Sequence, residues 1–153
     1  MLIQIALKGV SVLYSEVSAQ FHNRGDLLLS GQFEALLSSY VFPLPVFLPL
    51  HRMILRSPEG VRAILDLVRG ALIDRGVVAV RPQINAIDLP RAGRFRVWVD
   101  WHELAIPAAG TSISSAIYYC RQTESGLQVE MMNYTRQSMP ELSTKFSAIA
   151  LSA

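Results

Sequence analysis

The central part of the chain alternates between apolar and polar residues, which predicts three successive antiparallel strands over residues 94–106, 111–122 and 127–136. Pro, Gly, Ser and Thr between these segments are typical of turns. Successive strand side chains point to opposite sides. One face of the first strand therefore carries Phe95, Val97, Val99 and Trp101, and the other carries Arg96, Trp98, Asp100 and His102.

Helical spacing of apolar residues precedes these strands. It predicts a first helix over residues 11–30 that ends at Gly31, because glycine favours the turn after a helix. Gly25 lies inside this helix at a cost of about 1 kcal/mol relative to alanine. A short second helix is predicted over residues 33–40, and residues 1–10 are compatible with a short strand or a loose arm.

The third predicted helix has the clearest start and stop signals. Ser57 is a favoured N-cap, Pro58 suits the first helical position, and Glu59 interacts favourably with the helix dipole. An apolar stripe over residues 61–73 follows, and Gly76 is the expected stop.

Proline positions constrain the remaining segments. Three prolines in residues 41–50 predict an extended edge strand or rim, because proline cannot donate a hydrogen bond to a central strand. Residues 77–89 predict a strand in which Pro82 marks a bulge or a sheet edge. After Pro140 the residues are small and polar, which predicts an irregular or weakly helical end.

Length and composition narrow the class of protein. The 153 residues fit one domain, 1–153, and the order of helices followed by strands predicts an α+β fold. At 51% hydrophobic and 17% charged residues the chain is poor in charge, so we expect apolar surface to contact a ligand or another subunit.

Charge, cysteine content and hydropathy narrow the possible partners and the expected location of the protein. The net charge of +2 arises from scattered arginines, so we expect no nucleic-acid partner. The single Cys120 and the lack of a secretory pattern predict a cytoplasmic protein, with the thiol as a buried apolar group. The most apolar segment, residues 41–50, is too short for a membrane span, which needs about twenty residues.

The order of elements resembles the nuclear transport factor 2-like superfamily, which includes ketosteroid isomerases, scytalone dehydratases and polyketide-cyclase-like (SnoaL-like) proteins. The matching segments lie within about residues 11–137: SGQFEAL (Ser30–Leu36), Ser39-Tyr40 leading to Pro43, Ser57-Pro58-Glu59, Trp98–Glu103 and Val129–Thr135. The resemblance implies a cone-shaped, cystatin-like roll. In that roll a curved antiparallel sheet wraps around about three N-terminal helices and encloses a central pocket.

The resemblance also assigns the two sheet faces. Facing the pocket would be Val97, Val99, Trp101, Ala116, Tyr118, Cys120, Val129, Met131 and Asn133. On the convex face would be Trp98, Ile117, Tyr119, Met132 and Tyr134, a patch large enough to imply a homodimer. A one-residue bulge would exchange the two sets.

Candidate site residues come from the inner sheet face, from the first helix, which carries Tyr14, and from the pocket rim, where Tyr40 lies. Tyr14, Tyr40, Trp101, Tyr118 and Met131 would line the pocket, and Asn133 would orient a small organic ligand. The candidates for catalysis are Glu103, on the parity of Trp101, and the pair Asp100 and His102, on the opposite parity.

No cofactor is expected, and no metal, because His22, His51 and His102 lie on separate elements.

Three functions remain open. The first is a binding domain for a small molecule in a largely apolar pocket. The second is an isomerase, dehydratase or cyclase that acts on a small carbonyl or polyketide- or steroid-like substrate by acid–base chemistry. The third is a non-catalytic dimerisation module with a closed core.

Overall fold

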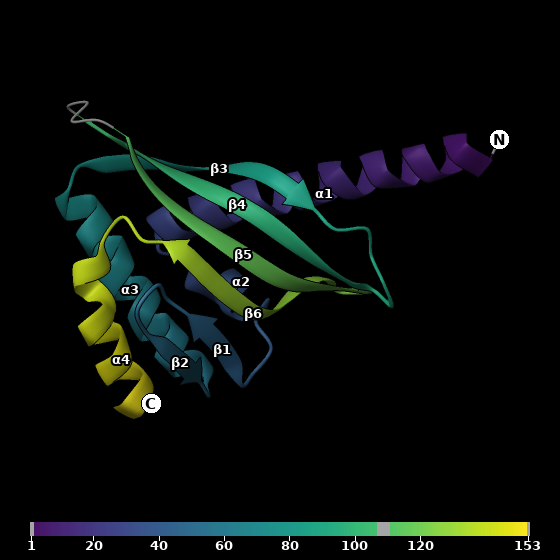
Figure 1. The fold of residues 1–153 in the computed structure, drawn as a ribbon. Helices are drawn as coiled ribbons and strands as arrows, with labels where there is room; N and C mark the ends of the chain where they lie inside the picture. Colours follow the sequence, from purple (N-terminus) through teal and green to yellow (C-terminus); the bar gives the residue numbers. More distant parts are fainter. Residues whose placement is uncertain (1, 107–110, 153) are drawn as a thin grey trace.

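The computed structural model describes residues 2–106 and 111–152, with side chains from residue 13 onward, as an α+β fold (Figure 1). In chain order the elements are α1 (Leu2–Ser30), α2 (Phe33–Leu37), β1 (Leu44–Phe47), β2 (Arg52–Leu55), α3 (Pro58–Asp74), β3 (Val77–Ile87), β4 (Arg94–Ala105), β5 (Ser112–Thr123), β6 (Gly126–Arg136), a 3₁₀ turn (Pro140–Leu142) and α4 (Ser143–Ser152). The strands form one sheet in the order β2-β1-β6-β5-β4-β3, and it does not close into a barrel. Neighbouring strands are antiparallel except for β1 and β6.

The central strands β4, β5 and β6 lie almost where the alternating pattern predicted them. Pro82 is in β3, which forms one edge of the sheet as expected. In Figure 1 the sheet faces the viewer with α1 and α2 behind it, so the helices cover one face and leave the other open. The covered, inner face carries Val97 and Val99, both fully buried with Val17 and Phe21 of α1 in one core.

Two glycines fit the path of α1. Gly31 ends the helix with a φ of 75°, and the amides of Gly31 and Gln32 donate to the carbonyls of Leu28 and Leu27, as in a glycine-ended helix. Gly25 stays helical because it permits a close approach: a Cβ there would lie 2.5 Å from the carbonyl oxygen of Val80 in β3. The sequence pattern identified the end of the helix at Gly31 but not the close contact between Gly25 and β3.

The start of α3 confirms the predicted signal, with Pro58 as its first residue. Ser57 occupies the N-cap position in extended conformation, although its side chain makes no capping hydrogen bond. After Arg75, Gly76 turns the chain into β3 with a φ of 76°.

The prediction of an edge strand for the proline segment is wrong. β1 lies between β2 and β6, and the sheet edge is formed by β2, which the pattern did not reveal. Pro45 is tolerated because the parallel ladder to β6 includes only Val46 and Phe47, beyond the proline.

The two chain ends are more helical than expected. The backbone of α1 begins at Leu2, so the alternative of a strand over residues 1–10 is wrong. The segment after Pro140 forms a 3₁₀ turn and then α4, in which Phe146 is buried. Burial of Leu142 and Phe146 explains why a segment with a weak pattern still forms a helix that packs against α3 and β2.

Two register shifts in β6 correct the predicted faces. Cys120 pairs with Val129 but Tyr119 pairs with Met131, so Glu130 is an extra residue that breaks the alternation. A second shift lies between Ser115 and Ala116, opposite the end of β6. The predicted face is therefore wrong for four residues: Met132 and Tyr134 lie on the inner face, and Met131 and Asn133 lie on the outer face.

None of the helices in the described part of the chain combines the length and hydropathy needed to cross a membrane.

Candidate functional site

A pocket of about 170 Å³ lies between the inner face of the sheet and the helices. Most of its wall is aliphatic or aromatic, contributed by α1, α3, α4 and the inner strand residues; examples are Leu28, Leu65, Val68, Leu72, Met132 and Phe146. The C-terminal helix therefore completes a wall that the sequence pattern did not predict.

Three of the predicted ligand residues reach this pocket and three do not. Tyr40, Trp101 and Tyr118 line it. Tyr14 is 51% exposed and is not part of the wall. Met131 and Asn133 are excluded by the bulge in β6, which brings Met132 and Tyr134 to the pocket instead.

Aromatic hydroxyl groups form a short hydrogen-bonded chain on the inner face. The indole nitrogen of Trp101 donates to the hydroxyl of Tyr118 at 2.8 Å, and the hydroxyl groups of Tyr118 and Tyr134 lie 3.3 Å apart. Burial raises the pKa of Tyr118 well above its usual value and also raises the pKa of Tyr134. Both tyrosines are therefore protonated at neutral pH. The Tyr118 oxygen accepts from the indole, which can only donate, so the Tyr118 O–H can donate a hydrogen bond to the Tyr134 oxygen. The Tyr134 O–H is then able to donate to a ligand.

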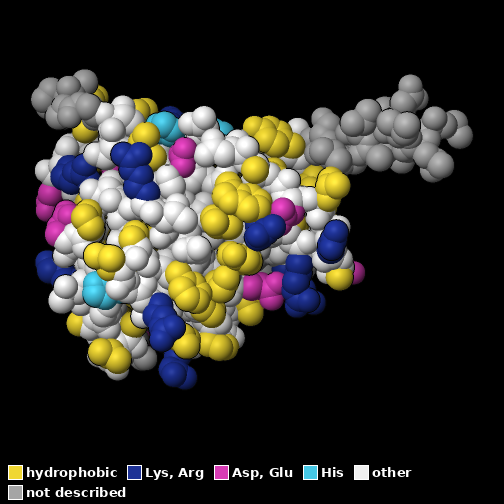
Figure 2. All heavy atoms as spheres, in the orientation of Figure 1, with side chains coloured by type: hydrophobic (Ala, Val, Ile, Leu, Met, Phe, Trp, Pro, Cys, Tyr) yellow, Lys and Arg dark blue, Asp and Glu magenta, His cyan; other side chains and the backbone are white. Residues whose placement is uncertain are grey.

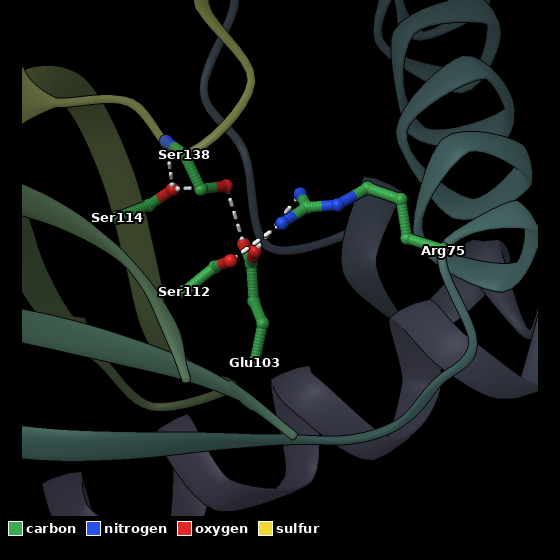
Figure 3. Close-up of polar contacts among 5 residues, drawn as sticks. All are labelled: Arg75, Glu103, Ser112, Ser114 and Ser138. Carbon is green, nitrogen blue, oxygen red and sulfur yellow. Dashed lines mark hydrogen bonds and ion pairs between the residues drawn. The ribbon is translucent and has the colours of Figure 1, made fainter. Parts of the chain in front are cut away.

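The carboxyl group of Glu103 lies at the end of the pocket where β4, β5 and the segment after β6 meet (Figure 3). Glu103 is buried, and its Oε2 accepts a hydrogen bond of 2.8 Å from Ser138. Ser138 is in turn positioned by Ser114, whose hydroxyl accepts from the Ser138 amide at 3.0 Å.

The other carboxylate oxygen of Glu103 is less well satisfied. Oε1 lies 3.5 Å from Nη1 of Arg75, at ion-pair distance, but accepts no hydrogen bond among the described residues. Burial raises the pKa of Glu103, although Ser138 and Arg75 act in the opposite direction. A buried carboxyl with an open acceptor on a pocket wall can exchange a proton with a bound molecule.

The pair Asp100 and His102 lies on the outer side of β4, away from the pocket. Asp100 accepts a hydrogen bond of 2.6 Å from Ser115, which lowers the pKa of its carboxyl group. The imidazole Nε2 of His102 is 2.9 Å from the side-chain oxygen of Gln83. Of the three candidates for acid–base chemistry, Glu103 is the one on the pocket wall.

Arg24 is a pocket residue that sequence reasoning missed. The residue is 8% exposed, and its guanidinium donates to Ser39 Oγ at 2.7 Å and lies 5.0 Å from the ring centre of Tyr40. A signal was present: Arg24 follows Phe21 by three residues and Val17 by seven, which puts a cation on the apolar face of the first helix.

Within the described residues, no group of three or more His, Cys, Asp or Glu side chains is arranged to hold a metal ion.

Comparison with solved structures finds many chains of similar fold. A nuclear transport factor 2-like protein with a cystatin-like fold from Novosphingobium aromaticivorans is 16% identical, with a TM-score of 0.60 over 95% of this chain and 96% of its own. A domain of unknown function with a cystatin-like fold from Nostoc punctiforme is 14% identical, with a TM-score of 0.63 over 88% and 83%. The beta subunit of the benzoate 1,2-dioxygenase from Burkholderia mallei is 12% identical, with a TM-score of 0.57 over 80% and 89%.

Comparison of the sequence alone finds no matching protein-family model and no matching curated protein. At such low identity, the structural likenesses establish the fold and leave activity open. The helices, the curved sheet and these neighbours together show that the chain has the nuclear transport factor 2-like, cystatin-like fold that the resemblance implied.

Proposed function

We propose that this chain binds a small organic molecule in the pocket between the inner sheet face and the helices. The supporting observation is the wall itself, which is largely apolar and carries polar groups at a few positions, among them Arg24, Tyr134 and Glu103. Sites for small molecules usually combine an apolar lining with a few placed polar groups. A module with a closed core would need no such space.

The size of the pocket restricts the ligand. Its volume of about 170 Å³ is close to the ~150 Å³ of a cavity that holds one benzene molecule and is smaller than the ~300–1,000 Å³ of drug-sized sites. A molecule with one ring fits this space better than a steroid or another ligand with several fused rings.

The proposal is tested by titrating the full chain with toluene and with phenylacetamide while amide shifts are followed by NMR. We expect saturable shifts for residues around the pocket, with dissociation constants between roughly a millimolar and a micromolar for ligands of this size. Leu65→Trp fills the pocket from α3 and should abolish the shifts. Ala63→Trp, at an exposed position of the same helix, should preserve them. Equal binding by both variants would exclude the pocket as the site.

A second candidate function is acid–base catalysis on a small carbonyl compound. The observation that favours it is the open acceptor Oε1 of buried Glu103 on the pocket wall. Together with a hydroxyl donor such as Tyr134, a carboxyl with a raised pKa can move a proton next to a carbonyl group. This function requires that Glu103 keeps its proton to a higher pH than an ordinary glutamate.

We also propose that the chain forms a homodimer through the outer face of the sheet. After correction for the bulge, the pairing of strands places one row of side chains across this face: Ala86, Trp98, Ile117, Asn133 and Phe47. Figure 2 shows hydrophobic side chains gathered on the side of the molecule where the sheet faces the viewer. Four of these five side chains are apolar, and an uncovered sheet face rich in apolar side chains is typical of a subunit contact.

A further inference from the structure

Arg24 is buried at the pocket, and its guanidinium has no carboxylate partner among the residues that the structure describes. Among the described residues it contacts the hydroxyl of Ser39 and the faces of three aromatic rings: Phe21 at 5.9 Å, Tyr40 at 5.0 Å and Tyr118 at 5.9 Å. Each of the ion pairs found among the described residues uses another arginine.

This arrangement is unusual for a purely structural arginine. A buried cation is stable when it is paired and hydrogen-bonded, and an unpaired one pays a large desolvation cost. Aromatic faces offset part of that cost. A guanidinium carries five N–H donors, however, and Ser39 accounts for one hydrogen bond. Because the Arg24 side chain lines the pocket, its other N–H donors can bind a molecule held there.

The surroundings hold the guanidinium in one orientation. The hydroxyl of Ser39 is itself fixed, because it donates to the carbonyl of Leu36 at 2.6 Å and so presents its oxygen to Arg24. The Tyr40 and Tyr118 rings restrict the guanidinium from the sides. Such preorganisation lowers the entropy lost on binding an anion.

We infer that Arg24 binds the anionic group of the ligand, and that the pocket takes a one-ring molecule carrying a carboxylate or a comparable oxyanion. This inference rests on the proposed binding function and adds the chemical class of the ligand. The planar guanidinium fork matches the two oxygens of a carboxylate, and the apolar wall accommodates the ring.

Glu103 does not compete for the same group. It is paired with Arg75 and Ser138, whereas Arg24 contacts Ser39 and aromatic rings. Arg24 also borders a second groove, between α1, α2 and the β5–β6 turn, which is lined by polar residues such as Gln20, Asn23 and Gln128. An anion held there instead would leave the apolar pocket unused, and the experiment separates these cases.

The test compares phenylacetate with phenylacetamide, which has the same shape and no charge, by calorimetric titration of the full chain at neutral pH. We expect the wild-type protein to bind phenylacetate about ten- to a hundredfold more tightly, the range for a charge-assisted pair. Arg24→Met should remove the preference, because it lowers the affinity for phenylacetate far more than the affinity for phenylacetamide. Arg81→Met, which removes an exposed arginine from β3, should keep the preference.

Each other outcome has a distinct meaning. Equal affinity of the wild type for both compounds overturns the role of Arg24 and leaves the pocket function intact. Binding of neither compound overturns both. Binding of phenylacetate to Leu65→Trp, in which the pocket is filled, assigns the anion to the second groove and also overturns the inference. If Arg24→Met does not fold, Arg24→Lys replaces it and should reduce the preference, since an ammonium group cannot form the two-pronged pair.

Discussion

At the scale of single residues, Glu103 gives the fold a pH dependence of unusual sign. Most carboxyl groups in folded proteins have lowered pKa values and stabilise the fold as the pH rises. Burial raises the pKa of Glu103 above its ordinary value of 4.5, so the folded state holds the proton more tightly than the unfolded state. Stability from this group is therefore complete below pH ~4.5 and is lost as the pH rises through the raised pKa.

We expect this loss to disappear in Glu103→Gln. The free energy of unfolding of the wild type, minus that of the variant, should fall by about 1.4 kcal/mol for each pH unit by which the pKa is raised. Urea denaturation at a series of pH values measures this difference in unfolding free energy. Other groups, such as Asp88 and Asp100 with their lowered pKa values, contribute equally to both proteins and cancel.

Glu124→Gln is the matched control, because this glutamate is exposed in the turn between β5 and β6. The difference in unfolding free energy between the wild type and Glu124→Gln should not show the same fall with pH. A difference that rises with pH for Glu103→Gln would mean that Arg75 and Ser138 outweigh burial. Glu103 would then be a fixed anion, unsuited to the proposed proton transfer.

Residue-level prediction from the sequence failed where a bulge intervened. Alternation placed Trp101, Tyr118 and Glu103 on the correct face, because β4 and the part of β5 around Tyr118 keep a period of two. The same rule misplaced Met131 and Asn133, since the extra residue Glu130 changes the period and carries no glycine or proline to mark it. The register of β6 is set by its pairing with β5, so the sequence pattern of β6 alone does not reveal it.

At the scale of elements, the contact between α1 and β3 depends on a missing side chain. A Cβ on Gly25 would meet the Val80 carbonyl oxygen at 2.5 Å and a ring carbon of Trp101 at 3.3 Å. Gly25→Ala gains about 1 kcal/mol of helix propensity, but the backbone clash forces the helix away from the sheet. We expect a net loss of about 1–3 kcal/mol of unfolding free energy, as for other overpacked cores.

Gly70→Ala provides the control for helix propensity alone. Gly70 is an exposed position of α3, and a Cβ there would have no atom within 4 Å. This variant should gain about 0.5–1 kcal/mol. Equal stability of the two variants in urea denaturation would show that α1 can shift freely on the sheet.

The elements predicted well from the sequence were those with local signals. Ser57 and Pro58 mark the start of α3, and Gly31 marks the end of α1, because capping and turn chemistry act within a few residues. β2 and α4 have no such signals. α4 is helical because Phe146 packs at the pocket wall, and that contact exists only after the chain has folded around it.

At the scale of the whole molecule, the order of elements identified the fold, while the site required three-dimensional pairing. An α+β order with one curved sheet follows from periodicities that survive small errors in register. The pocket depends on Arg24, Met132 and Tyr134, whose positions combine a helix face with a strand shifted by a bulge. The chemistry of the site is therefore harder to predict from the sequence than the architecture of the fold.

The proposed dimer makes the last prediction, because Ile117 lies in the middle of the outer row, between Trp98 and Asn133. Light scattering should give the wild type twice the monomer mass of 17.0 kDa. Ile117→Asp should shift it to the monomer, since an unpaired carboxylate in a subunit contact costs several kcal/mol. Val78→Asp, an equivalent change at an exposed site on the edge strand β3, should leave the dimer intact. A wild type that is monomeric at high concentration, or a dimer unaffected by Ile117→Asp, would exclude the outer face as the subunit contact.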